Sequence, residues 1–250
     1  MTRAGGIRLV VLGAAVALLE GTCRLGFVSR HAVIAPSEMV RGAWRALGQE
    51  DVRRDLLLTL STVVQSFVLA VAVGFAIGVA LHRLPRLRRA LDPFLASYYA
   101  VPTFVFYPVF IVLFGLNRWP LVAIGFVFAV VAVAINTLDG LARVPRSFIR
   151  TAGVMRLSRG QTLVHVILPA AAPWLFTGAK FAVAYSFIGV IAGEFVQAGS
   201  GIGFAIAFAY NSFDSLTMYG LMIVLFGIVG TLNMTLWSFE RRLYARRGGR

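Results

Sequence analysis

Two charged side chains stand inside one long apolar run, where a charge carries a high free-energy cost. Lys180 and Glu194 both fall within the run from 170 to 196. A carboxylate in such a helix must be paired or must face water. Glu194 is therefore a candidate for a gate or a solute path. The alternative is an ion pair or hydrogen bond that fixes helix packing, for instance with Asn136. Lys180 is expected to reach the inner interface with its flexible stem.

The residue combinations that catalysis needs are missing. Gly199-Ser200-Gly201 is similar to the serine loop of intramembrane proteases, but all three histidines precede it, so a turn or re-entrant loop is expected. No His-Glu-x-x-His motif occurs, and Lys180, the only lysine, is not in a Gly-Lys-Ser/Thr phosphate loop. The single cysteine, Cys23, excludes an internal disulfide and a cysteine-built zinc site. We expect no enzyme activity, no metal and no cofactor bound by this chain.

The elements that position these residues are membrane helices. Apolar residues make up 59% of the chain, charged residues 14%, and the mean hydropathy is +0.82. This composition is typical of an integral membrane protein and not of a soluble globule. Runs of about 20 apolar residues predict spans. We predict an all-α bundle of about six transmembrane helices, forming a single domain over 1–250: approximately 7–28, 56–81, 94–114, 119–138, 170–196 and 216–239.

The first of these spans and the distribution of arginine bear on topology. The stretch 7–28 carries Glu20 and Arg24, and it has a signal peptide as its alternative interpretation. Glu20-Gly21-Thr22 before Cys23 is a poor cleavage site, which favours a retained helix. With the N-terminus inside, sixteen arginines fall on the cytoplasmic side and seven outside. The positive-inside rule then predicts that both termini are cytoplasmic.

A short helix is expected between the first two spans. Pro36-Ser37 followed by Glu38 predicts a helix start. Val40, Trp44 and Leu47 recur on one face, which predicts a helix that lies at the outer surface.

Aromatic, hydroxyl and proline residues cluster in the span 94–114. Pro102 and Pro108 each remove a backbone hydrogen bond, so a kinked helix is expected. Tyr99, Thr103 and Tyr107 near the kink are candidates to line a solute path, with a bend absorbed by packing as the alternative.

Glycine pairs separated by four positions occur in two spans. Gly74 and Gly78 lie in the second span, and Gly189 and Gly193 in the fifth. This spacing lets helices approach closely, so packing is their expected role.

The segment between the fourth and fifth spans is long and basic. Phe148, Ile149, Ala152 and Met155 fall at helical spacing and predict a short helix over about 148–161 with an apolar face. Such a helix can lie on lipid headgroups. It can equally dock into a groove of a cytoplasmic partner.

From about Pro36 to Phe239 the chain resembles the inner-membrane permease subunit of binding-protein-dependent ABC importers, in the branch that takes up nitrate, sulfonates and taurine. The resemblance rests on the order of several short motifs. They are Thr59-Leu60-Ser61-Thr62-Val63, Arg88-Arg89-Ala90-Leu91-Asp92-Pro93, Val101-Pro102, Asn136-Thr137-Leu138-Asp139-Gly140, and Glu194 followed by Ser200-Gly201-Ile202-Gly203.

The family's diagnostic cytoplasmic element is a Glu-Ala-Ala, then a glycine four positions on, then Ile-x-x-Pro. Here it falls on Arg150-Thr151-Ala152, on Arg156, and on Val166-Ile167-Leu168-Pro169. The resemblance implies that the segment couples the permease to an ATPase subunit. The residues implied are Arg150, Thr151, Ala152, Met155, Arg156, Leu157, Ser158 and Arg159.

The same resemblance implies the partners and the setting. They are a separate ATP-binding subunit that holds ATP and Mg, a periplasmic or lipid-anchored substrate-binding protein, a second copy of the chain, and the lipid of a bacterial inner membrane, with no nucleic acid. The expected function is a permease that moves a small organic or inorganic solute by alternating access. A self-contained secondary transporter or channel is the alternative, but it would show charges in several spans and inverted repeats.

Overall fold

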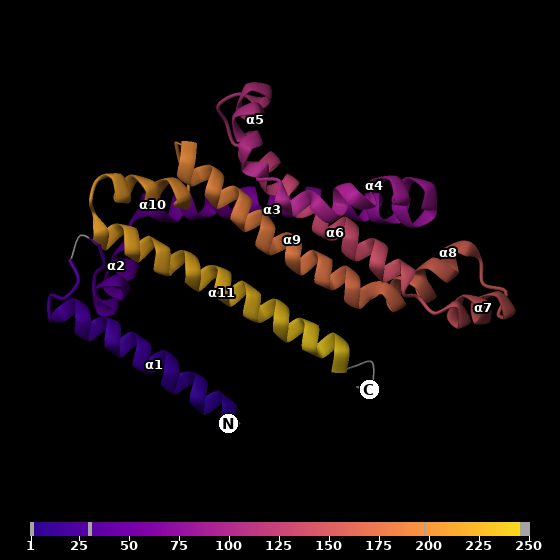
Figure 1. Cartoon of the computed structure of the whole chain (residues 1–250), viewed down its shortest axis with the longest axis horizontal. Helices are drawn as coiled ribbons and strands as arrows, with labels where there is room; N and C mark the ends of the chain where they lie inside the picture. The colour runs from indigo at the N-terminus through magenta and orange to yellow at the C-terminus, as the bar shows by residue number, and fades with distance from the viewer. Residues whose placement is uncertain (1–2, 30–31, 198, 246–250) are drawn as a thin grey trace. The chain divides into compact units, whose positions relative to one another are not determined.

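The computed structural model describes residues 3–29, 32–197 and 199–245, and every regular element among them is a helix (Figure 1). The all-α prediction is confirmed. The first half of the chain forms α1 (Arg3–Arg24), α2 (Pro36–Gly48), α3 (Glu50–Arg83), α4 (Pro85–Ser97), the short η1 (Tyr98–Ala100) and η2 (Thr103–Phe106), and α5 (Tyr107–Phe114). The second half forms α6 (Trp119–Ala142), α7 (Arg146–Val154), α8 (Arg159–Thr162), the π-helical turn η3 (Leu163–Ile167), α9 (Leu168–Gln197), α10 (Ile202–Asn211) and α11 (Ser215–Ala245).

Four helical stretches of the described chain are long and apolar enough to cross a membrane. They are Glu50–Arg83, Trp119–Ala142, Arg159–Val196 and Ser215–Arg241, and a bent pair of helices makes up to five. These correspond to five of the predicted spans. The predicted span 7–28 coincides with α1, which is not among these stretches, so its crossing of the membrane stays a prediction.

The predicted span 94–114 is broken and not merely kinked. The helical stretch Pro85–Ala100 turns by 91° into Thr103–Phe114. Val101, the residue before Pro102, is extended with φ −83° and ψ 123°, because a following proline disfavours the α conformation. Pro108 lies in the first turn of α5, where its missing N–H has no helical partner to lose.

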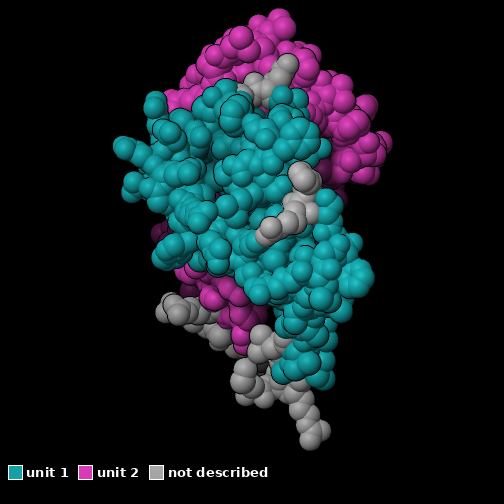
Figure 2. Space-filling view, turned by 90° about the vertical axis from the view of Figure 1, so that its left-hand side faces the viewer, with its two compact units in different colours: residues 1–59, 194–231 teal, residues 60–193, 232–250 magenta. Residues whose placement is uncertain are grey.

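The described chain forms two compact units, coloured separately in Figure 2, where the sequence predicts one domain. One unit consists of residues 1–59 and 194–231, and the other of 60–193 and 232–250. Because α3, α9 and α11 each contribute to both units, neither unit is a separate sequence domain.

In the first unit, α2 packs through its small residues. Gly42, Ala43 and Ala46 are buried. A Cβ on Gly42 would lie 2.5 Å from the carbonyl oxygen of Leu216 on α11, so the two backbones touch. The helix predicted at Pro36 is confirmed. Its bulky apolar side chains, which include Trp44 at 80% exposed, point away from this core. A small core of Ala46, Val52, Ile202, Ile206 and Leu221 completes the unit.

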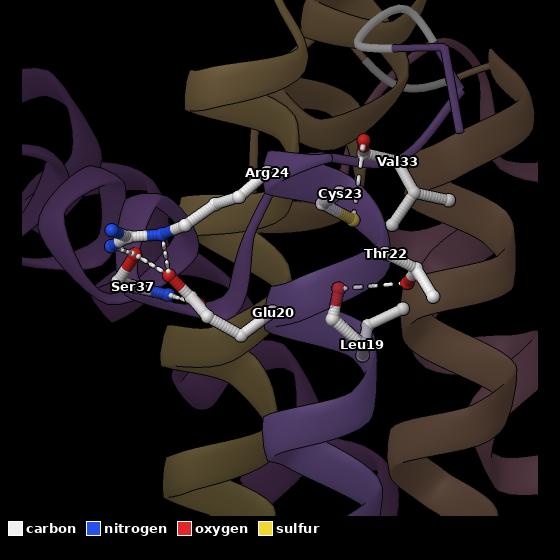
Figure 3. A network of polar contacts seen from close by, with 7 residues as sticks. All are labelled: Leu19, Glu20, Thr22, Cys23, Arg24, Val33 and Ser37. Carbon is white, nitrogen blue, oxygen red and sulfur yellow. Dashed lines mark hydrogen bonds and ion pairs between the residues drawn. The ribbon is translucent and has the colours of Figure 1, made fainter. Parts of the chain in front are cut away.

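Glu20 of α1 holds the start of α2 (Figure 3). Its carboxylate accepts hydrogen bonds from the Ser37 backbone amide at 3.0 Å and the Ser37 hydroxyl at 2.7 Å. The Arg24 guanidinium pairs with the same carboxylate at 2.6 Å. A carboxylate at a helix N-terminus satisfies amides that have no partner within the helix. Glu20 and Arg24 therefore stabilise the junction between α1 and α2.

In the second unit, α6 is the most buried of the apolar helices. Of its most apolar stretch, 61% is buried. Ala129, Val130 and Val133 pack with Ala70 of α3 and Ala182 of α9. A second cluster near the other end of α6 joins Leu141 and Val144 to Ala171. These small and β-branched residues let three helices meet closely.

The predicted packing role of the glycine pairs is confirmed within this unit. A Cβ on Gly74 would lie 2.6 Å from the Val130 carbonyl oxygen, and one on Gly78 would lie 2.5 Å from the Thr137 Cβ. On α9, a Cβ on Gly189 would lie 2.8 Å from Gly125 Cα. Each position therefore admits only glycine unless the helices move apart.

Lys180 has a partner that the sequence alone does not reveal. Its Nζ lies 2.8 Å from Glu240 Oε2 on α11, and both side chains are mostly buried. Nearby, the rings of Phe176 and Phe239 pack at a centroid distance of 5.6 Å. The ion pair satisfies the charge of Lys180 within the protein and joins α9 to α11.

Candidate functional site

The predicted helix over 148–161 is interrupted. Its first part is α7, which ends at Val154, and its last part is α8, which begins at Arg159. Arg156 between them has φ +52°. The Arg156 amide donates to the Gly153 carbonyl and the Leu157 amide to the Ala152 carbonyl, both at 3.0 Å. This pair of hydrogen bonds is a Schellman motif, which ends a helix with a left-handed residue.

The Schellman motif explains the glycine that the resemblance places at Arg156. A left-handed backbone favours glycine because a Cβ is strained there. In this chain an arginine adopts the conformation.

A capping box starts the second part of the segment. The Ser158 hydroxyl accepts from the Gln161 amide at 3.2 Å, and the Gln161 side chain accepts from the Ser158 amide at 2.8 Å. Each group satisfies an amide that would lack a partner at the start of α8. The Ser-x-x-Gln spacing was readable in the sequence, and it gives the physical reason why one continuous helix does not form.

The apolar side chains of the segment are exposed in this structure. Met155 is 66% exposed and Val154 is 85% exposed, and Phe148 and Ile149 are about half exposed. Ala152 is buried, while Arg150, Thr151, Arg156, Ser158 and Arg159 are exposed. The α7–α8 segment therefore presents a mixed apolar and basic surface with room for a partner.

Tyr99 of the broken span belongs to a row of aromatic rings. It stacks on Tyr185 of α9 at a centroid distance of 5.2 Å, and Phe181 continues the row at 6.1 Å. The neighbouring Tyr98 donates a hydrogen bond from its hydroxyl to the Val127 carbonyl at 2.6 Å. The row fixes η1 against α6 and α9 and leaves Tyr99 about half exposed.

The other predicted path residues have separate neighbours. Thr103 and Tyr107 are buried, and the Tyr107 ring stacks on Phe104 at 5.5 Å. The Asn136 side chain donates to the Ala132 carbonyl at 2.8 Å within α6. Tyr99, Thr103, Tyr107 and Asn136 belong to one compact unit and Glu194 to the other.

Glu194 is buried and hydrogen-bonded, at 2% exposed. Its carboxylate accepts from the Thr59 hydroxyl at 2.8 Å and from the Gly203 amide at 3.0 Å. The hydrogen bonds that the alternative role requires are present, and they are made with Thr59 and Gly203, where the sequence suggested Asn136.

Gly201 makes this arrangement possible. Its φ is +101°, and a Cβ there would lie 2.4 Å from the Glu194 carboxyl carbon. Only glycine tolerates this conformation and leaves space for the carboxylate. The predicted turn at 199–201 is confirmed as a bend that precedes α10.

Sequence reasoning missed Asp55, Thr59 and Tyr185. Asp55 and Thr59 are spaced by four residues and so share one face of α3, a signal that was available. Tyr185 carried no such signal, because its partner Tyr99 is distant in the sequence. Among the residues described, no group of three or more His, Cys, Asp or Glu side chains is arranged to hold a metal.

Residues 70–247 match the family described as binding-protein-dependent transport system inner membrane component. One relative is the bicarbonate transport system permease protein CmpB of Synechococcus elongatus, with 32% identity over 70% of this chain and 63% of that protein. Another is the nitrate import permease protein NrtB of Leptolyngbya laminosa, with 29% identity over 89% of this chain and 82% of that protein. The taurine transport system permease protein TauC of Escherichia coli is 28% identical over 76% of this chain and 69% of that protein.

The match to CmpB covers less than two thirds of that relative's length. A chain from an inward facing structure of the MetNI methionine ABC transporter shares the fold, with a TM-score of 0.66 and 19% identity over 77% of this chain and 95% of that one. The family match extends over well more than half of the sequence. This chain belongs to the family of inner membrane components of binding-protein-dependent transport systems.

Proposed function

We propose that this chain is the permease subunit of an ATP-binding-cassette importer and forms the translocation path for a small organic or inorganic solute. The observation that carries the proposal is the family match over residues 70–247. Relatives named as bicarbonate, nitrate and taurine permeases support it. Because those names cover small anions and one zwitterion, we propose a solute of that chemical class.

The ATPase partner is proposed to dock on the α7–α8 segment. Exposed Val154 and Met155 supply an apolar contact, and Arg150, Arg156 and Arg159 supply a basic rim. A short amphipathic helix that enters a groove is a recurring mode of recognition. ATP and Mg would be held by that partner, since the chain lacks a phosphate-binding loop.

The topology follows from the same proposal. A helix that crosses the bilayer has its two ends on opposite faces, so α9 would separate the ATPase side, at its α7–α8 end, from the receptor side, at its α10 end. A substrate-binding protein would deliver solute to that second face. A second copy of the chain would complete the pore in a bacterial inner membrane, with both termini cytoplasmic.

ATP binding would act on the permease by favouring one of two arrangements. An ATPase shifts such an equilibrium only through contacts that differ between the two states. The α7–α8 segment is the proposed point of contact, because η3 joins it directly to the start of α9. Alternating access would result from closing and opening of the paired ATPases.

Copurification tests the docking surface. Affinity-tagged chain extracted from its native membrane in mild detergent is expected to retain an ATPase, detected by ATP hydrolysis and by mass spectrometry. Met155→Asp and Val154→Asp place a charge in the apolar contact and should reduce the bound ATPase at least about tenfold. Phe27→Asp is the matched control, since this exposed residue follows α1 and lies outside the proposed contact.

Two outcomes would contradict the proposal. Equal ATPase binding in the Met155→Asp variant, the Val154→Asp variant and the control would exclude this docking surface. Concentrative solute uptake by vesicles that hold the purified chain alone would instead support a secondary transporter.

A further inference from the structure

The first amides of α10 are held by side chains from other helices. Gly201 precedes the helix and has no side chain with which to cap it. Its own amide donates to Asp55 Oδ1 at 2.9 Å. The Ile202 amide donates to Thr59 Oγ1 at 2.9 Å, and the Gly203 amide donates to Glu194 Oε2 at 3.0 Å. Three consecutive amides thus bond to three different side chains.

Thr59 is the central member of this arrangement, which we call the α10 latch (Asp55, Thr59 and Glu194). Its hydroxyl donates to the Glu194 carboxylate and accepts from the Ile202 amide. Thr59 is 1% exposed and Glu194 is 2% exposed. A buried polar group that loses its hydrogen-bond partner cannot form a hydrogen bond with water instead. Removing one member of the latch therefore leaves the other members unsatisfied, which costs the free energy of desolvating them.

The latch bonds to the start of a helix that lines a cavity. A cavity of about 570 Å³ lies within the first unit, and α10 and α11 contribute most of its lining. The lining residues include Ile206, Ala209 and Tyr210 from α10 and Met218, Tyr219 and Met222 from α11. The N-terminus of α10, which forms one wall of this cavity, is bonded to Thr59 of α3 and to Glu194 of α9.

The length of α10 indicates why an external clamp is needed. With ten residues it is too short to cross a bilayer, and it connects the spanning helices α9 and α11. A short helix of this kind has marginal stability by itself, so its order depends on packing and capping.

We infer that Asp55 and Thr59 are positioning residues that fix α10 as a rigid wall of this cavity on the receptor side of the permease. The assignment of this cavity to the receptor side rests on the topology proposed above. The role of the latch is inferred only from the three amide hydrogen bonds, all of which lie within one compact unit. Neither residue is proposed to touch the solute.

Amide hydrogen exchange of the full chain in lipid nanodiscs tests the latch directly. Thr59→Val keeps the shape of the side chain but can neither donate nor accept, whereas Thr59→Ser keeps both functions. In overlapping peptides that cover 199–211, Thr59→Val should accelerate exchange of the Ile202 and Gly203 amides by about tenfold or more. Thr59→Ser should exchange like the parent chain.

The matched control is Thr177→Val. The Thr177 hydroxyl donates only to the Pro173 carbonyl of its own helix, at 3.0 Å, so this variant loses a hydroxyl of the same type without touching α10. Its exchange over 199–211 should stay unchanged. Unaltered exchange in Thr59→Val, or an equal acceleration over all helices, would overturn the inference.

A second variant covers the case in which Thr59→Val does not fold. Asp55→Ala removes the acceptor for the Gly201 amide, and it should accelerate exchange at the start of α10 while α11 remains protected. Slow exchange there in a folded Asp55→Ala variant would also overturn the inference. These measurements need no ATPase, so failure of the latch and failure of the proposed function are distinguishable.

Discussion

At the scale of single residues, Arg156 carries backbone strain in an exposed position. A left-handed residue with a Cβ costs about 1–2 kcal/mol more than glycine, part of which the greater flexibility of glycine in the unfolded chain offsets. Arg156→Gly should therefore stabilise the chain by about 0.5–1 kcal/mol. Unfolding in mixed micelles measures the change.

Arg150→Gly is the control for this prediction. Arg150 lies inside α7 and is also exposed, and glycine in a helix interior should destabilise by about 1 kcal/mol. If both variants destabilise the chain equally, the left-handed turn at Arg156 is not strained.

At Gly201 the reverse change, from glycine to a residue with a Cβ, should destabilise the chain. Gly201→Ala places a Cβ 2.4 Å from the Glu194 carboxyl carbon in a conformation with φ +101°. Strain and overpacking together should destabilise by about 3 kcal/mol. Gly199→Ala, whose Cβ would meet nothing within 4 Å, should be nearly neutral in the same unfolding assay. Equal stability of the two variants would contradict the geometry described here.

At the scale of elements, the ion pair between Lys180 and Glu240 fixes α11 to α9. Lys180→Met or Glu240→Gln should each destabilise by about 1–3 kcal/mol, because each leaves a mostly buried charge without a partner. The double variant should lose less than the sum of the two single losses. The exposed pair Arg88 and Asp92, 3.7 Å apart, is the control and should show a coupling below about 1 kcal/mol. If the coupling energy between Lys180 and Glu240 is also below about 1 kcal/mol, solvent screens this pair as it does the exposed one.

Local sequence patterns predicted the helices well because hydropathy and proline positions act within each segment. The five spans, the start of α2 at Pro36 and the glycine contacts are of this kind. The 91° break at Pro102 exceeded the expected kink, since the bend angle depends on what the two halves pack against. Which face of α2 is buried also depends on the elements that pack against it. The structure buries its small residues and leaves Trp44 exposed.

The candidate site was predictable only in part, for a related reason. The cost of burying Glu194 indicated that it must have a partner, but hydropathy cannot tell which residue that partner is. Thr59 is 135 residues away in the sequence, and only the fold brings the two together. The end of α7 near Arg156 could not be predicted from residue type, because arginine does not have the preference of glycine for the left-handed conformation.

At the scale of the whole molecule, the proposed topology predicts which loops share a side of the membrane. With Cys23 replaced by alanine, Phe213→Cys and Val154→Cys each supply one exposed thiol. A membrane-impermeant maleimide should label Phe213→Cys in intact cells, because α9 places its loop on the outer face. It should label Val154→Cys only after the cells are permeabilised. Labelling of both variants in intact cells would contradict the crossing of α9.

The exposed apolar side chains of α7 have a consequence for how the cell makes this protein. Phe148, Ile149, Val154 and Met155 are all exposed, so water would contact them in a copy that lacks the proposed ATPase partner. Exposed apolar patches of this kind favour self-association and attract quality-control proteases. If the α7–α8 segment is the ATPase docking surface, as proposed above, a chain synthesised in excess of that ATPase would be short-lived, and the ratio at which the two polypeptides are translated would set how many complexes accumulate.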